Sequence, residues 1–180
     1  MKKIILVLAA LFCVATVSAK DGKFVSGVKD FGNAVAEQTW TAGLRVGSGL
    51  QATAEWMYSD AAYVEGRFGM SWCNAGAVVM ADFTALHNWN VCTMDWTPSA
   101  GEWFFDAGCG VGVGGREHYC YVGAAGCAKL GIKLNSVPLR IAVDWTPVIG
   151  PEIGYGGGNS VAKFNSYGLA NFGVSCAYCF

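Results

Sequence analysis

The last thirteen residues, 168–180, alternate between two kinds of side chain and end on an aromatic residue. A period of two is the signature of a β-strand, because successive side chains point to opposite faces. One face carries Ala170, Phe172, Val174, Cys176, Tyr178 and Phe180, and the other carries Leu169, Asn171, Gly173, Ser175, Ala177 and Cys179. An apolar face opposite a mostly small or polar one is expected of a barrel wall with lipid outside and a packed lumen inside.

The N-terminal residues 1–19 have the features of a cleaved signal peptide. Lys2 and Lys3 precede an apolar run from Ile4 to Val17, and small residues close the segment at 17–19. A charged start, an apolar centre and an A-x-A-like site are typical of a secretory signal. A single-span anchor is disfavoured, since a spanning helix needs about 20 apolar residues.

The mature chain from Lys20 would have 161 residues (180 minus 19), which suits one domain. The net charge of the whole chain is −1, so charge gives no reason to expect nucleic acid as a partner. After residue 19 no apolar stretch is long enough for a transmembrane helix, and a closed β-barrel is the other structure that satisfies all backbone groups in lipid. Residues 20–39 show helical spacing and predict an N-terminal arm or a short amphipathic helix before a barrel over 40–180.

From Trp40 onward the period is two, and we expect an all-β, eight-stranded antiparallel transmembrane barrel. The predicted strands are Thr41–Met57, Ala62–Ser71, Ala77–His87, Val91–Trp96, Trp103–Val113, Cys120–Leu134, Leu139–Val148 and Gly168–Phe180. A hairpin at Gly47-Ser48-Gly49 would give nine strands. Alternation passes through these glycines unbroken, so the first strand is interpreted as one long, kinked strand.

Short polar segments at 73–76, 98–101 and 135–138 predict tight turns on the side of the two termini, and 114–119 and 154–160 predict longer loops on the other side. Two aromatic belts are expected at the membrane interfaces. Trp40, Trp72, Trp96, Trp103 and Phe180 are assigned to the side of the termini, and Trp56, Tyr58, Trp89 and Trp145 to the far side.

The alternation also predicts that the charges of the strands point inward. The inward set is Arg45, Glu55, Glu65, Arg67, Asp82, Asp95, Asp106, Lys129, Lys133, Arg140 and Asp144. A soluble β-sandwich, the main alternative, would put a charged face in water. Eight strands leave a lumen just wide enough for side chains, so these charges predict a salt-bridged plug without a channel.

Metal and cofactor sites are not expected. Seven cysteines remain after residue 19, and the C-x-x-C pair Cys176 and Cys179 would point to opposite faces of a strand, which argues against a shared metal. We interpret most cysteines as small wall residues.

The chain resembles the small eight-stranded outer-membrane β-barrel proteins of Bacteroidetes-type, Gram-negative bacteria. The resemblance covers 40–180 and is carried by Gly-Leu-Arg-Val-Gly at 43–47 and by the segments 64–69, 103–108, 138–145 and 178–180. It implies a monomer in the cell outer membrane, with outer-membrane lipid, lipopolysaccharide and the barrel-assembly machinery as partners. By the same resemblance Tyr178 and Phe180 are an assembly signal, and Cys179 stands where family members commonly have a basic residue.

Two functions remain open at this stage. The preferred one is a non-enzymatic barrel that is structural or presents loops to surface ligands, with no catalytic residue. The alternative is a lipid A-modifying enzyme, an acyltransferase or deacylase, that would use His87 or His118 at the outer rim. No Ser and acid complete a recognisable triad with either histidine.

Overall fold

The computed structural model describes residues 40–59, 61–72, 79–156, 159–165 and 167–180, with the backbone alone for 155–156, 159–165 and 167. The predicted signal peptide, the predicted arm at 20–39 and the predicted turn at 73–76 lie outside the described residues.

The described residues form ten strands and one short 3-10 helix. The strands are β1 (Trp40–Gly47), β2 (Gly49–Ser59), β3 (Ala62–Ser71), β4 (Met80–Met94), β5 (Gly101–Arg116), β6 (Tyr119–Leu134), β7 (Leu139–Trp145), β8 (Val148–Gly156), β9 (Asn159–Asn165) and β10 (Phe172–Cys179), and the 3-10 helix is η1 (Tyr167–Ala170).

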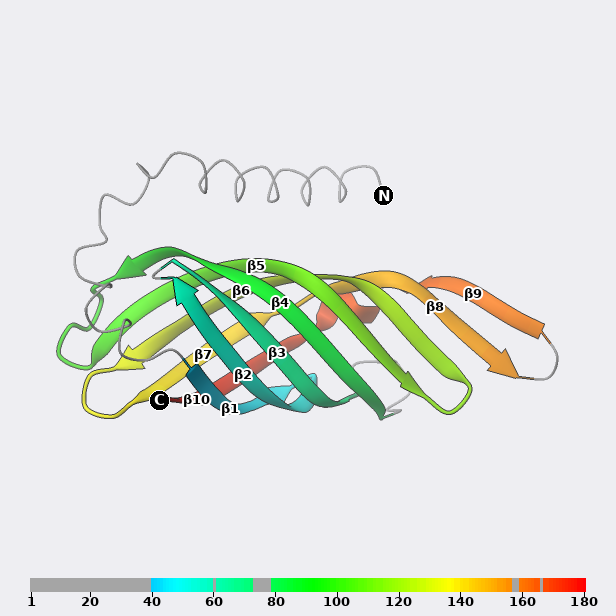
Figure 1. The fold of residues 1–180 in the computed structure, drawn as a ribbon, viewed down its shortest axis with the longest axis horizontal. Coiled ribbons are helices and arrows are strands. Elements are labelled where there is room, and N and C mark those ends of the chain that lie inside the picture. The colour runs from blue at the N-terminus through cyan, green and yellow to red at the C-terminus, as the bar shows by residue number, and fades with distance from the viewer. Residues whose placement is uncertain (1–39, 60, 73–78, 157–158, 166) are drawn as a thin grey trace.

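These strands close into an eight-stranded antiparallel barrel, which confirms the all-β barrel predicted from the alternation (Figure 1). The ring closes because β1 pairs with β10 and β5 pairs with β6. β7 and β8 follow β6 in one register, with Ala128 opposite Trp145 and Ala125 opposite Val148, so they form a single interrupted strand. β9 pairs with β8, and β10 pairs with β7, so β9 and β10 together form the eighth strand of the barrel.

The prediction of one long strand over 41–57 is wrong: β1 and β2 form a tight hairpin around Ser48. Val46 faces Leu50 and Arg45 faces Gln51. The turn is centred on residue 48, so each residue faces one of the same parity, and alternation looks identical for a hairpin and for a continuous strand. Gly47 allows this turn to approach β10, because a Cβ there would lie 2.3 Å from the carbonyl oxygen of Phe172.

The separation of Ala77–His87 from Val91–Trp96 is also wrong. β4 is continuous from Met80 to Met94, and its register against β5 shifts between Asn90 and Cys92. A β-bulge shifts the outward positions from one parity to the other. In the sequence this shift resembles the end of one strand and the start of another. The prediction counted β1 and β2 as one strand and β4 as two strands. These two errors cancel, so the predicted total of eight strands is right although both assignments are wrong.

Three other boundaries differ from the expected ones. β5 and β6 extend almost to each other, and the loop expected at 114–119 is a two-residue turn in which His118 has a φ of 61°. The stretch 154–160, expected as a loop, belongs largely to the β8–β9 hairpin. Residues 168–170 lie in η1, where Gly168 approaches the backbone of Val148 so closely that a Cβ would lie 2.0 Å from its carbonyl oxygen.

The corrected strand directions move several connections and aromatic residues. Strands β2 and β3, β4 and β5, and β6 and β7 are connected at the end that holds Trp40 and Phe180, the two termini of the barrel, whereas β3 ends and β4 begins at the far end. Trp56, Tyr58 and Trp89 therefore lie toward the termini, contrary to expectation. Trp56 stacks on Trp40, with ring centroids 6.1 Å apart.

The barrel is polar inside and apolar outside. Phe68 on β3 is 65% exposed, while its neighbour Arg67 is 1% exposed. The same contrast repeats along β10, whose buried residues alternate with exposed ones. The interior is thus where polar side chains must find partners.

Candidate functional site

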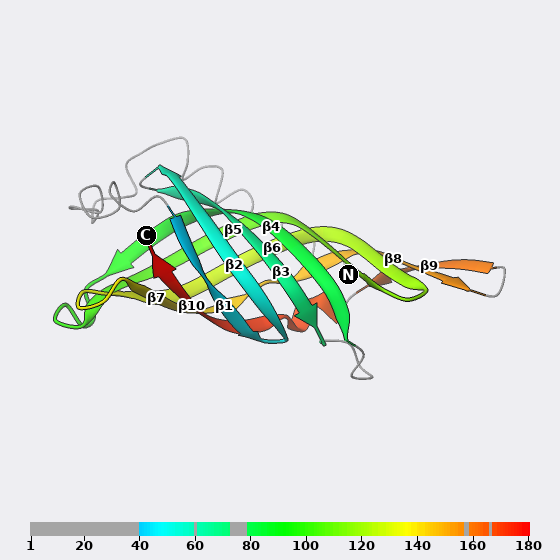
Figure 2. The ribbon, with the colours of Figure 1, turned by 60° about the horizontal axis from the view of Figure 1, so that its bottom comes forward.

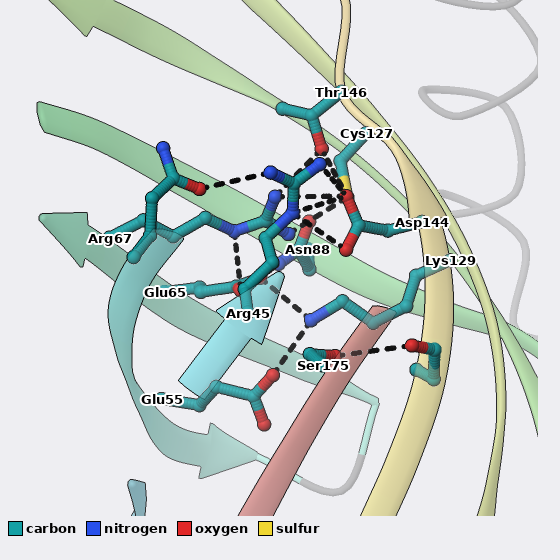
Figure 3. Close-up of polar contacts among 12 residues, drawn as sticks. Arg45, Glu55, Glu65, Arg67, Asn88, Cys127, Lys129, Asp144, Thr146 and Ser175 are labelled. Atoms are coloured by element: carbon teal, nitrogen blue, oxygen red, sulfur yellow. Dashed lines mark hydrogen bonds and ion pairs between the residues drawn. The ribbon is translucent and has the colours of Figure 1, made fainter. Parts of the chain in front are cut away.

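Nine charged side chains are buried inside the barrel, contributed by seven of its strands. Figure 3 shows the part of this set around Lys129 and Asp144. They are Arg45, Glu55, Glu65, Arg67, Asp82, Asp106, Lys129, Arg140 and Asp144, and the sequence assigned every one of them to the inward face. Among the described residues this makes five acids and four bases. We call them the lumen network.

Asp144 on β7 joins two arginines from two other strands. Arg45 on β1 donates from Nε to both carboxylate oxygens at 2.9 Å. Arg67 on β3 donates from Nη1 to Oδ1 at 3.1 Å and to the hydroxyl of Thr146 at 2.8 Å. Charge-assisted bonds of this kind are stronger than neutral ones, so Asp144 ties β1, β3 and β7 together.

Lys129 on β6 bridges the next two acids. Its Nζ lies 2.7 Å from Oε1 of Glu55 and 2.8 Å from Oε2 of Glu65. Glu65 also accepts from Nε of Arg67 at 2.6 Å and from Nδ2 of Asn88 at 2.8 Å. The Glu65 carboxylate therefore connects the Asp144 group with the Lys129 group.

Arg140 on β7 completes the network toward the termini. It donates to Oε2 of Glu55 at 2.7 Å and also to Asp106. Its guanidinium carbon lies 4.0 Å from the ring centroid of Phe104 and 4.9 Å from that of Tyr63, within the range of cation–π attraction. Tyr63 in turn donates to Asp106 at 2.7 Å.

Asp82 differs from the other acids in the described part of the chain, because none of the ion pairs there includes it. Its Oδ2 accepts from Nε2 of Gln51 at 2.6 Å, while its Oδ1 is buried and has no hydrogen-bond partner. Gln51 also accepts from Arg45 at 3.0 Å. The amide of Gln51 thus stands between Asp82 and the closest arginine in the hydrogen-bond chain.

Two of the eleven predicted residues do not join the network. Asp95 is exposed, because β4 ends at Met94 and Asp95 falls in the connection to β5. Lys133 is only half-buried near the end of β6, in register with Glu102 and Arg140.

The sequence analysis overlooked the uncharged members of the site. Thr41, Gln51, Tyr63, Asn88, Asn90, Thr146 and Asn171 all donate to or accept from a charged side chain of the lumen network. Most of these residues share the inward parity of the charges on their own strand, and that parity was the signal that could have identified them.

Apolar side chains fill the lumen farther from the termini. Leu86, Ala125, Cys127 and Val148 form a buried cluster, and Tyr121 packs against it. The ring of Tyr121 also covers Gly114, where a Cβ would lie 2.4 Å from the ring. Glycine on β5 therefore makes room for an aromatic side chain inside the barrel.

The two histidines do not share a rim. His87 points outward from β4 toward the end with the termini, where its Nε2 contacts the hydroxyl of Tyr58, and its ring lies 4.4 Å from that of Trp89. His118 is at the β5–β6 turn, at the far end, 3.4 Å from Glu117. The expectation that both lie at the outer rim is wrong for His87. The β1–β2 hairpin adds a reversal of direction that was not predicted, so β4 runs toward the end that holds Trp40 and not away from it.

The described cysteines are free thiols. Cys176 is exposed and Cys179 is buried, as two residues of opposite parity should be. In the described ranges no three or more His, Cys, Asp or Glu residues form a group able to hold a metal ion.

The C-terminal strand closes the barrel against β1. The backbone N–H of Phe180 donates to the carbonyl of Trp40 at 2.9 Å. Tyr178 and Phe180 both project outward and are exposed, with ring centroids 5.0 Å apart.

The sequence matches no protein-family model, and comparisons with curated proteins and with solved structures find no match. Within the part of the chain that the structure describes, no helix is long and apolar enough to cross a membrane.

Proposed function

We propose that this protein is an integral outer-membrane β-barrel with a closed lumen, acting as a scaffold that is structural or presents its loops to surface ligands. The observation that carries the proposal is the inverted arrangement of polarity in a closed barrel. Charges are buried in the lumen network, and large apolar side chains are exposed on the wall.

The outer wall favours lipid as its surroundings. Leu44, Phe68, Met70, Val143 and Phe172 are each more than half exposed, and they are distributed over β1, β3, β7 and β10. Soluble monomers rarely expose contiguous apolar patches beyond a few hundred square ångströms. In β1–β7 and β10, the described charged side chains point inward or lie at strand ends, which suits a wall in hydrocarbon.

Aromatic residues bracket this wall at two levels. Trp40, Trp56, Tyr178 and Phe180 lie toward the termini, and Trp72, Trp145 and Phe172 lie toward the far end. Eight residue steps separate Phe172 from Phe180, which at ~3.3 Å per residue and a tilt of ~40° is about 20 Å along the barrel axis. That is close to the ~25 Å apolar band of outer-membrane barrels.

A scaffold is favoured over a channel because side chains occupy the lumen. The ion pairs of the lumen network, which include Arg45 with Asp144 and Arg140 with Asp106, cross the interior nearer the termini. The cluster around Leu86 fills the lumen nearer the far end. The lipid A enzyme hypothesis gains no support from the described contacts of the histidines: His87 contacts Tyr58 and Trp89 on the outside of the wall, and His118 lies beside Glu117 at a hairpin tip.

Cell fractionation and heat-modified electrophoresis test the proposal. We expect the mature protein in the outer-membrane fraction, and we expect unheated protein in SDS to migrate differently from boiled protein, because a closed ladder has no edge from which to unravel. Recovery from the soluble periplasm together with identical migration of the two samples would contradict it.

A further inference from the structure

The barrel wall is uneven at the end away from the termini. The β1–β2 hairpin turns back at Ser48, whereas the β5–β6 and β8–β9 hairpins reach much farther in both views (Figures 1 and 2). We call the far part of β5, β6 and β8, comprising residues 109–115, 120–126 and 148–154, the extended wall.

The outward face of the extended wall is apolar throughout. Val111, Val113, Val122 and Ile153 are between 39% and 55% exposed. The other outward positions of these three strand segments are Cys109, Gly115, Cys120, Ala124, Gly126, Ile149 and Pro151, so this face carries no charge. Charged side chains appear only at the tip, at Arg116 and Glu117, and on the inward face, at Glu152.

An apolar sheet face of this kind needs a cover, because a sheet that projects into water normally turns polar residues to it. The register makes the face continuous across the three strands: Val111 faces Ala124, and Ala124 faces Ile149. Protein docking surfaces have a polar rim around an apolar centre. No such rim separates Val111 from the rest of β5, since Ala107, Phe105 and Trp103 continue the same outward row.

The length of the apolar wall along the barrel axis differs between strands by an amount comparable to a substantial fraction of the hydrocarbon thickness of a bilayer. On β10 it spans about 20 Å, as derived above from Phe172 and Phe180. On β7 and β8 the outward row from Ile141 to Ile153 covers twelve residue steps in one register, or about 30 Å by the same conversion.

We propose that membrane acyl chains cover the outward face of the extended wall, so that the hydrocarbon reaches farther along β5, β6 and β8 than along β10, β1 and β2. The inference rests on the proposed membrane location. A barrel with unequal sides meets a bilayer of uniform thickness by tilting or by deforming the bilayer locally.

Fluorescence quenching in vesicles tests this assignment. In a variant whose native cysteines are replaced by alanine and which retains the heat-dependent shift in SDS, Val113→Cys, Val122→Cys and Ile153→Cys are each labelled with an environment-sensitive fluorophore. Val174→Cys on the β10 wall and Glu117→Cys at the hairpin tip are the matched controls. Phosphatidylcholine vesicles carrying nitroxide-labelled acyl chains supply the lipid quencher, and aqueous iodide supplies the other.

We expect lipid nitroxides to quench the three extended-wall labels at least half as strongly as the Val174→Cys label, and iodide to quench them at least threefold less than the Glu117→Cys label. Quenching by iodide as strong as at Glu117→Cys would overturn the inference, and so would shielding from both quenchers, which would indicate a protein cover. If the Val174→Cys label also escapes the lipid quencher, the proposed membrane location itself fails, which separates the two failures.

Discussion

Replacing Arg140 by methionine should destabilise the barrel by about 3–5 kcal/mol, because it strands a buried acid. Arg140 is the only cation paired with Asp106 among the described residues, whereas Glu55 keeps Lys129 and Asp144 would keep Arg45 if Arg67 were removed. Methionine preserves most of the stem packing and loses the cation–π contacts with Phe104 and Tyr63. The free energy of unfolding would be measured in detergent micelles or vesicles by urea titration of tryptophan fluorescence, with reversibility checked from both directions.

The double variant Asp106→Asn with Arg140→Met separates the stranded charge from the lost packing. We expect it to be more stable than Arg140→Met alone by about 2 kcal/mol, because it removes the unpaired carboxylate. Arg116→Met at the exposed hairpin tip is the control and should change stability by less than about 0.5 kcal/mol. An Arg140→Met protein as stable as wild type, or a double variant less stable than the single one, would refute the ion-pair argument.

Four further outcomes are expected. The purified protein should give negligible conductance in planar bilayers, since side chains fill the lumen, and large stable single-channel currents would contradict a plug. His87→Ala and His118→Ala should leave the acyl chains of host lipid A unchanged by mass spectrometry, because neither histidine belongs to a recognisable Ser-His-acid triad, whereas a gained or lost chain would favour the enzyme. Deleting Phe180 should lower the membrane-inserted, protease-resistant fraction far more than Ala177→Ser, since Phe180 is an exposed aromatic at the closing strand, and equal insertion would argue against an assembly role. Asp82→Asn should cost less than about 1 kcal/mol, because Asp82 takes part in no described ion pair, whereas a loss as large as that of Arg140→Met would show that its charge is needed.

Much of the barrel could be predicted from side-chain parity. The inward positions of Arg45, Arg67 and Asp144 follow from alternation along single strands, because a strand with one face in an apolar environment must send all its charges to the other face. Asp95 was misplaced because parity says nothing about where a strand ends.

Strand boundaries were less predictable, because side-chain parity does not distinguish a turn from a continuous strand or a bulge from a strand end. The three-residue turn at Ser48 preserves parity and hides a reversal of direction, while the bulge between Asn90 and Cys92 changes parity without any reversal. Pro147 has no backbone N–H, so it interrupts β7 and β8, but Gly126 still donates to its carbonyl at 2.8 Å and holds the strand on β6.

The sequence by itself determined that the chain forms β-strands with charges on one face and apolar groups on the other, since that pattern is a local property with a period of two. Only the tertiary structure decided which charges pair, because Arg45 and Asp144 are 99 residues apart and meet only when the ring closes. The tertiary structure likewise decided that the wall extends a short way from the termini at β1 and β2 and much farther at β5, β6 and β8. These features depend on the register between neighbouring strands, and register is fixed by closure of the whole barrel.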